Sequence, residues 1–311
     1  MIALLAPGQG SQAPGMLTPW LSTDGVDATL DGWSDGAGLD LRTLGTTATA
    51  EQIKDTSVTQ PLIVATALLA FEQLAVHVQL PADAPTAGHS VGELAAAAIA
   101  GVLSPADAVG FAAVRGHEMA AACASEPTGM SAVLGGRPEQ VLERLEELGL
   151  DPANRNGAGQ VVAAGPSAAL EKLAAEPPER ARVVPLAVAG AFHTRFMAPA
   201  EQALSGYADE LTPDDPTRPL LSNADGQVVE RGDELLRRLV AQVTRPVRWD
   251  LCMATLRELG VTAVIELPPA GALVGLVKRE LKGVATLALR GPEDLDGAAE
   301  LMAEHAAGAA A

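Results

Sequence analysis

Residues 86–100 read Thr-Ala-Gly-His-Ser-Val-Gly-Glu-Leu-Ala-Ala-Ala-Ala-Ile-Ala. Within this stretch, Gly88 to Gly92 match the pattern G-x-S-x-G, in which a strand bends sharply into a helix and holds a serine at the bend. Glycine is needed because a β-carbon in so tight a turn would clash with neighbouring backbone. The helix N-terminus then aims its N–H groups at an oxyanion beside Ser90. A glycine-rich loop with an incidental serine is the alternative, and the flanking strand and helix argue against it.

The chain on either side of this motif alternates strands and helices. Ile2 to Ala6 reads as a short buried strand that ends at Pro7-Gly8. A helix is expected from about 58 to 78. Another is expected to begin at Pro105, directly after the capping residue Ser104, and to run to about 122. The later expected elements are helices near 199–210, 233–243 and 249–259, a strand at 263–267, a helix from about 273, and a frayed alanine-rich tail from 301.

The middle of the chain shows its own alternation of shorter strands and helices. Strands are expected at 130–134, 161–164 and 182–188, with helices at 138–148 and 167–175 between them. This β-α-β-α-β alternation predicts a small ferredoxin-like subdomain over residues 125–189. Residues 1–124 and 190–311 would then form one larger α/β catalytic domain around the insertion.

Composition excludes several classes of protein. The chain has 311 residues, 48% of them apolar, so that a sizeable core can form. Its net charge of −18 argues against nucleic acid or an anionic membrane as a partner. The two cysteines argue against a disulfide framework and a zinc cluster. No uninterrupted apolar run approaches the ~18 residues of a membrane span, and residues 1–5 are too short for a signal-peptide core, so we expect a cytoplasmic protein.

A serine nucleophile needs a base, and the chain offers five histidines: His77, His89, His117, His193 and His305. His77 lies at a helix end with no polar residue expected nearby, and His305 lies in the tail. His117 fits an exposed position on a helix. His89 adjoins Ser90, and neighbouring side chains on an extended segment point in opposite directions. His193 follows a strand in the apolar loop 190–193 and is therefore the preferred base.

A glycine-rich loop, Gly8-Gln9-Gly10-Ser11-Gln12, follows the first expected strand. It matches neither a dinucleotide-binding fingerprint nor a phosphate-binding P-loop. It is either a source of N–H donors for an oxyanion hole or simply a tight strand-to-helix turn.

Together with Arg115-Gly116, these motifs make the chain resemble the malonyl-CoA:acyl carrier protein transacylases of fatty-acid synthesis, and more distantly the acyltransferase domains of polyketide synthases. The resemblance covers nearly the whole chain in order and spacing. The matching segments are 7–12, 59–61, 88–93, 115–116, 154–156, 159–162, 190–193, and Gln242 with 246–249.

The resemblance implies an α/β-hydrolase-like large domain and a transfer of malonyl from malonyl-CoA to acyl carrier protein through a malonyl-serine. In this interpretation Ser90 is the nucleophile and His193 its base, and the backbone carbonyl of Gln242 orients the imidazole. Gln9 and the N–H of Val91 would form the oxyanion hole. Such chemistry calls for no metal and no cofactor.

The resemblance also implies that two further residues select the acyl group. Arg115 would hold the malonyl carboxylate, because a guanidinium offers a planar, two-pronged donor. Its apolar helical setting also weakens its interpretation as a surface ion-pair residue. Phe192 would fill space beside the acyl α-carbon and so favour malonyl over branched units.

Two other functions remain open at this point. A serine thioesterase or other hydrolase has the order Ser…Asp/Glu…His with a late histidine, whereas 118 residues follow His193, no acid stands out as its partner, and a hydrolase has no use for Arg115. A module that only binds CoA or a carrier protein would not require Ser90 and His193 together.

The carrier proteins of this pathway are acidic, so docking would need local positive charge. Residues 231–290 contain ten Lys/Arg and six Asp/Glu. We hypothesise a docking face drawn from this segment, against the simpler view that these are scattered solvated charges. The candidates are Arg237, Arg238, Arg245, Lys278, Arg279 and Lys282.

Overall fold

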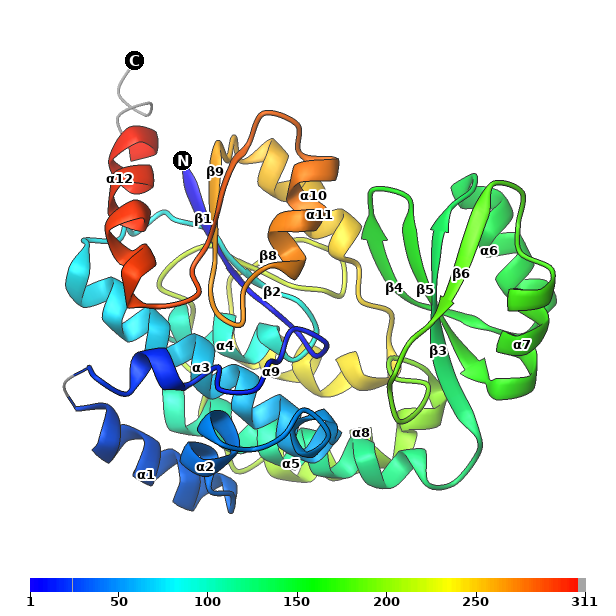
Figure 1. Ribbon diagram of the computed structural model, residues 1–311, viewed down its shortest axis with the longest axis horizontal. Helices are drawn as coiled ribbons and strands as arrows, with labels where there is room; N and C mark the ends of the chain where they lie inside the picture. Colours follow the sequence, from blue (N-terminus) through cyan, green and yellow to red (C-terminus); the bar gives the residue numbers. More distant parts are fainter. Residues whose placement is uncertain (24, 307–311) are drawn as a thin grey trace.

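The computed structural model describes residues 1–23 and 25–306. It contains a six-stranded sheet with the order β10-β9-β1-β2-β7-β8, in which only β8 runs antiparallel to its neighbour (Figure 1). The strands are β1 (Ile2–Ala6), β2 (Thr86–Gly88), β7 (Leu220–Leu221), β8 (Val228–Val229), β9 (Ala263–Glu266) and β10 (Ala285–Ala288).

The central strand β1 shows why this sheet is covered on both faces. All five of its residues are apolar and buried, as expected for a parallel strand between two layers of helices. Ile2 and Leu4 belong to the larger core, whereas Ala3 and Leu5 belong to a second core on the opposite face. The strand predicted at Ile2–Ala6 is confirmed.

Helices pack on both faces. The larger core includes α3 (Thr56–His77), α4 (Gly92–Ile99), α5 (Pro105–Cys123) and α12 (Leu295–Ala306), and the second core includes α10 (Trp249–Glu258) and α11 (Ala272–Glu280). The remaining helices of this part are α1 (Val26–Ala37), α2 (Leu41–Thr46), α8 (Ala198–Ala208) and α9 (Gly232–Ala241). Ser104 caps α5 as predicted, accepting a hydrogen bond from the N–H of Asp107 at 3.0 Å.

Helix α3 is long and largely apolar, although it contains no uninterrupted apolar run of membrane-spanning length. It is long and apolar enough to cross a membrane, with an 18-residue window of mean hydropathy 1.4. Polar residues such as Gln60 and Thr66 interrupt its sequence, so the expectation from the sequence still holds. The structure buries 72% of that window, and α3 packs against α4 and α5. It therefore serves as a core helix of this fold.

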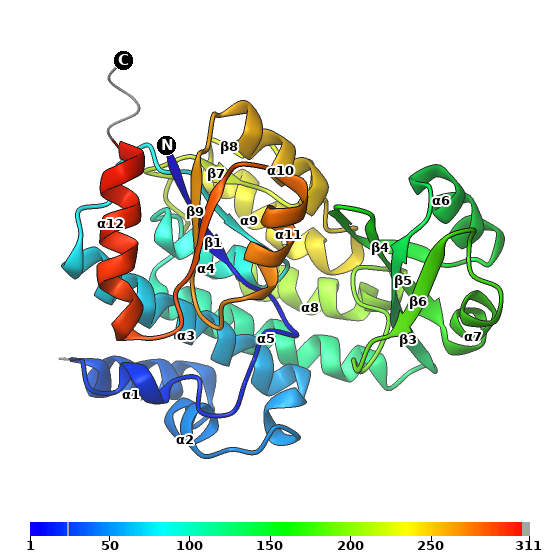
Figure 2. The same cartoon turned by 45° about the horizontal axis from the view of Figure 1, so that its top comes forward.

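The second sheet is antiparallel, with the order β4-β5-β3-β6, and lies beside one end of the first (Figure 2). Its elements follow in the order β3 (Thr128–Gly135), α6 (Pro138–Glu147), β4 (Asp151–Gly157), β5 (Gln160–Pro166), α7 (Ser167–Ala175) and β6 (Ala181–Pro185). This β-α-β-β-α-β order is the ferredoxin-like one.

Strand β4 was not predicted. Its sequence, Asp-Pro-Ala-Asn-Arg-Asn-Gly, is polar and contains proline and glycine, which are depleted in strands. Pairing with β5 holds it extended, with two register shifts along the ladder. Hydrogen bonds of 2.9 Å join it to Val247 in the larger part of the chain, from the N–H of Arg155 and to the carbonyl of Ala153.

Two other differences concern the ends of the chain. The glycine-rich segment after residue 20 contains α1 and α2, where the sequence has only weak helical signals. The tail that we expected to fray from Leu301 remains helical in α12 up to Ala306, because Ala298 and Met302 are buried in the core. The rest of that tail lies outside the described residues.

Candidate active site

Ser90 occupies the bend between β2 and α4, with the left-handed φ of 54°. The flanking glycines are required sterically. A β-carbon on Gly88 would collide with the backbone of Gly92, and one on Gly92 with the carbonyl of Ala6. Asn223 secures the turn, because its Oδ1 accepts from the Ser90 N–H at 2.8 Å and its Nδ2 donates to the Gly88 carbonyl at 2.8 Å.

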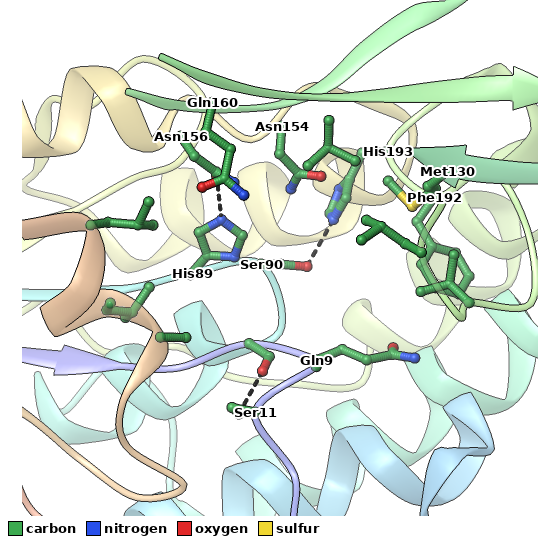
Figure 3. A pocket seen from close by; sticks show the side chains of 18 of the residues that line it. Gln9, Ser11, His89, Ser90, Met130, Asn154, Asn156, Gln160, Phe192 and His193 are labelled. Carbon is green, nitrogen blue, oxygen red and sulfur yellow. Dashed lines mark hydrogen bonds between the residues drawn. The ribbon is translucent and has the colours of Figure 1, made fainter. Parts of the chain in front are cut away.

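His193 lies directly against this serine (Figure 3). Its Nε2 is 2.8 Å from Ser90 Oγ, and its Nδ1 is 2.8 Å from the carbonyl oxygen of Gln242. Since the carbonyl can only accept, Nδ1 carries the proton and Nε2 is left as the acceptor. Burial, followed by the charge of Arg115, lowers the pKa of His193 to about 3, so the ring is neutral near pH 7. A neutral imidazole with its lone pair on the hydroxyl is suited to act as a general base.

The other histidines lie elsewhere. His89 turns away from Ser90 Oγ, and its Nε2 is 2.9 Å from Asn156 Oδ1. His117 is exposed. The expectation that His77 has no polar neighbour is wrong, because its Nε2 lies 2.9 Å from a carboxylate oxygen of Asp296. His305 is ordered as well, with Nδ1 2.8 Å from Thr262 Oγ1.

Arg115 brings a buried positive charge to the same point. Its side chain, on α5, is only 2% exposed. The guanidinium donates to Gln60 Oε1 at 2.6 Å, Gln242 Oε1 at 2.9 Å and Ser90 Oγ at 3.3 Å. All three acceptors are neutral, and within the described ranges no carboxylate lies within ion-pair distance. Burial lowers the pKa of Arg115 to about 10, which leaves it charged at neutral pH.

The two expected oxyanion donors flank the serine. Val91 is buried and precedes α4, and its N–H makes no hydrogen bond to any described residue. Gln9 borders the same cavity, where its Nε2 donates to Thr56 Oγ1 at 3.2 Å. The glycine loop passes close to the elbow, since a β-carbon on Gly8 would meet the carbonyl of His89.

These groups open onto a cavity of about 390 Å³ between the two sheets. Its apolar lining includes Phe192, Met130 and Val188, and its polar lining includes Asn154 and Gln160 of the smaller sheet. That size suits a small acyl group and part of its carrier. No cluster of three or more potential metal ligands occurs among residues 1–23 and 25–306.

Sequence reasoning missed three site residues. Gln60 and Asn223 hold Arg115 and Ser90, and Glu93 lies buried behind them. Glu93 had a local signal, since it directly follows the elbow glycine. Asn223 had none, because it reaches the elbow from the loop after β7, 133 positions away in the chain.

Known proteins share this architecture. The family model described as "Acyl transferase domain" matches residues 4–305. The malonyl CoA-acyl carrier protein transacylase of Mycobacterium tuberculosis is 59% identical over 302 residues, which cover 97% of this chain and 100% of that protein.

Two solved structures extend the comparison. The crystal structure of the Mycobacterium tuberculosis enzyme gives a TM-score of 0.94 at 59% identity, covering 96% of this chain and 99% of that one. A type II PKS acyl-carrier protein in complex with its malonyl-transacylase gives 0.90 at 29% identity, covering 96% and 99%. The chain therefore belongs to the malonyl CoA-acyl carrier protein transacylase family.

Proposed function

We propose that this protein transfers the malonyl group of malonyl-CoA to the phosphopantetheine thiol of acyl carrier protein, in two steps through a malonyl ester on Ser90. One observation carries the proposal. A serine–imidazole pair and a buried arginine without a carboxylate partner among the described residues meet at one oxygen atom, Ser90 Oγ.

In the first step, His193 Nε2 takes the Ser90 hydroxyl proton as Oγ attacks the thioester carbonyl. The oxyanion is stabilised by the Val91 N–H and by Gln9 after its amide leaves Thr56. The tetrahedral intermediate collapses, its C–S bond breaks, and the imidazolium returns the proton to the departing CoA thiolate. The products are free CoA and malonyl-Ser90.

The second step reverses the first with a new thiol. His193 accepts the proton of the phosphopantetheine thiol, whose sulfur attacks the malonyl ester. When the C–O bond breaks, the imidazolium protonates Ser90 Oγ and restores the starting enzyme. The carbonyl of Gln242 keeps Nδ1–H in place throughout, so that one tautomer serves both steps.

Substrate choice is assigned to Arg115 and Phe192. The guanidinium gains the malonyl carboxylate as its first anionic partner in the described structure, and a charge-assisted pair in a buried setting is strong. Phe192 is 5% exposed and borders the cavity beside His193. Its ring leaves little room at the acyl α-carbon, which favours malonyl over branched units.

The same proposal divides the chain into a catalytic domain of residues 1–124 and 190–311 and an inserted subdomain of residues 125–189. Support comes from the separate antiparallel sheet and from a small core of its own, which includes Val133, Leu145 and Leu173. We also place the protein in the cytoplasm. The free thiols of Cys123 and Cys252 fit a reducing compartment.

Mass spectrometry tests the function directly. Incubation with malonyl-CoA should add about 86 Da, the mass of a malonyl group, to the protein. Adding holo acyl carrier protein should move this mass onto the carrier, and Ser90→Ala should show neither event. A hydrolase would release free malonate without lasting adduct, and a binding module would show no covalent change. Either result would contradict the proposal.

A further inference from the structure

A buried carboxylate behind the active site takes no part in the two steps above. Glu93 lies in the first turn of α4 and is 1% exposed. Its Oε1 accepts from the N–H of Asn223 at 3.1 Å, and its Oε2 accepts from Nε2 of Gln242. Burying a carboxylate is costly unless both oxygens are satisfied. This arrangement satisfies each oxygen with a group that also contacts the reacting residues.

The partner Gln242 contacts both halves of the site. Its main-chain carbonyl accepts from His193, and its side-chain Oε1 accepts from Arg115 Nη2 at 2.9 Å. Its Nε2 donates to Glu93 and, at 3.3 Å, to Asn223 Oδ1. The direction of this one amide therefore decides whether Arg115 meets an acceptor or a donor.

An ionised carboxylate can only accept hydrogen bonds. Both oxygens of Glu93 face donors, and in its ionised form Glu93 therefore fixes Nε2 of Gln242 on its own side and turns Oε1 toward the guanidinium. With the amide rotated by half a turn, Nε2 would point at Arg115 Nη2, donor against donor. The guanidinium would then lose one of its three contacts and its place beside Ser90.

We propose that Glu93 is a positioning residue for acyl-group selection: it orients the side-chain amide of Gln242, which in turn holds Arg115 where it receives the malonyl carboxylate. The inference rests on the proposed function of Arg115. It assigns Glu93 no contact with substrate and no proton transfer.

Glu93→Gln is the central variant because it keeps size and shape. Its carbonyl oxygen still accepts from the Asn223 N–H, but its NH₂ now faces Nε2 of Gln242, so the Gln242 amide must rotate. We expect kcat/KM for malonyl transfer to fall about 10- to 100-fold, the usual worth of a hydrogen bond to a charged group. Acetyl transfer, which needs no cation, should change much less, and labelling of Ser90 by a small serine-directed inhibitor should persist.

A double-mutant cycle isolates the path through Gln242. Gln242→Leu removes the amide and leaves the main-chain carbonyl that orients His193. If Glu93 acts through this amide, adding Glu93→Gln to Gln242→Leu should cause no further loss of malonyl over acetyl selectivity. The matched control is Glu266→Gln. Glu266 is equally buried, but it accepts from the N–H groups of Leu273 and Val274, so this change should alter stability and leave the selectivity ratio unchanged.

These variants distinguish a failure of the Glu93 role from a failure of the Arg115 role. Equal losses of malonyl and acetyl transfer in Glu93→Gln would overturn the positioning role. Should that variant fail to fold, Gln242→Leu decides alone, because full malonyl selectivity without the amide would also overturn the role. Arg115→Ala tests the proposed function of Arg115, which fails if this variant keeps its malonyl over acetyl selectivity. If selectivity is lost in Arg115→Ala but kept in Glu93→Gln, only the role of Glu93 is rejected.

Discussion

The two halves of the active site are held in place by different means. Ser90 and His193 depend mainly on backbone geometry: both adopt left-handed φ angles, 54° and 60°, and a main-chain carbonyl orients the imidazole. One side chain, that of Asn223, also holds the Ser90 turn. Arg115 is held by side chains, through the amide oxygens of Gln60 and Gln242. The proposed reacting pair is thus positioned mainly by the fold, whereas the proposed carboxylate-binding residue, Arg115, is positioned by side chains that substitution can change.

This difference indicates how selectivity can change while the chemistry is kept. Left-handed φ at a residue with a side chain is strained, and such strain is retained where the surrounding structure enforces it. Apart from Asn223, which bonds directly to the Ser90 turn, side chains can be replaced without removing these backbone contacts. The amides around Arg115 have no such protection, so changes there should alter which acyl group is transferred before they alter whether transfer occurs.

The largest expected effect comes from the backbone-held half. His193→Ala removes the base and should slow formation of the malonyl enzyme by about two to four orders of magnitude. Malonyl and acetyl transfer should fall by similar factors, because the proton transfer is common to both. Quenched-flow mass spectrometry of the acyl enzyme measures both rates. Strongly unequal losses would break the comparison, since His193 would then also act in selection.

Substitution of Arg115, in the half held by side chains, should change malonyl transfer more than acetyl transfer. Arg115→Ala should reduce malonyl transfer at least about 100-fold, because two charge-assisted hydrogen bonds of about 1.5–3 kcal/mol each are lost. Acetyl transfer should gain in relative terms. Arg115→Lys should recover only part, since a point charge cannot reproduce the fork. Competition between the two thioesters for Ser90 gives the ratio, and an equal fall for both would mean that Arg115 only supports the fold.

The same contrast explains what the sequence could predict. Ser90 and its two glycines form a local motif, and the helix after Ser104 carries its own cap, so both were accessible from spacing alone. His193, Arg115 and Gln242 received roles through the resemblance. In the structure His193 and Arg115 contact Ser90 Oγ, and Gln242 contacts both of them. These roles remain proposals.

The rest depends on contacts that no local pattern records. Asn223 and Glu93 become partners only when the loop after β7 packs against α4. Strand β4 is polar, and pairing rather than propensity makes it a strand. Strands β7 and β8 have two residues each, too few for a periodic signal.

A smaller effect should appear when pH is varied. Burial raises the pKa of Glu93 to about 7, whereas the pKa of His193 is lowered to about 3. As pH falls through about 7, Glu93 gains a proton and one oxygen becomes a donor, which loosens the Gln242 amide as Glu93→Gln does. Malonyl over acetyl selectivity in the wild type should therefore fall about tenfold or less, the worth of one ordinary hydrogen bond, and should be flat in Glu93→Gln.

The groups around Glu93 do not mimic this change. The charged or titratable side chains that face it or border the cavity beside it are Arg115, Arg155, Arg238, Arg245, Arg248 and Cys252. Burial raises the pKa of Cys252 well above its usual value, so this thiol does not titrate near pH 7. A wild-type ratio that does not change with pH would show that the Gln242 amide keeps its direction without a charge on Glu93.

The smallest expected effect is on docking of the carrier protein. It depends on which surface cations have a carboxylate partner and which do not. Of the proposed docking residues, Arg237 and Arg238 on α9 are both paired with Glu234 at 2.7 Å, and Arg238 is also paired with Asp225 at 2.7 Å, so two carboxylates balance the two cations. Arg245 borders a separate cavity next to Glu93. Lys278 and Arg279 at the end of α11, with Lys282 just after that helix, form the α11 group. None of the three has an ion-pair partner among residues 1–23 and 25–306, and Arg279 borders the active-site cavity.

We therefore expect the α11 group alone to attract an acidic carrier protein. Lys278→Glu should raise the KM for acyl carrier protein about two- to fivefold, in line with the 0.2–1 kcal/mol of an exposed charge pair. The KM for malonyl-CoA should not change, because Lys278 lies outside the cavity lining. Arg237→Glu is the matched control, with the same charge change on a paired residue. Steady-state kinetics at low and high salt measures both. Equal shifts in the two variants would indicate a general effect of net charge, and no shift in Lys278→Glu would remove α11 from the docking face.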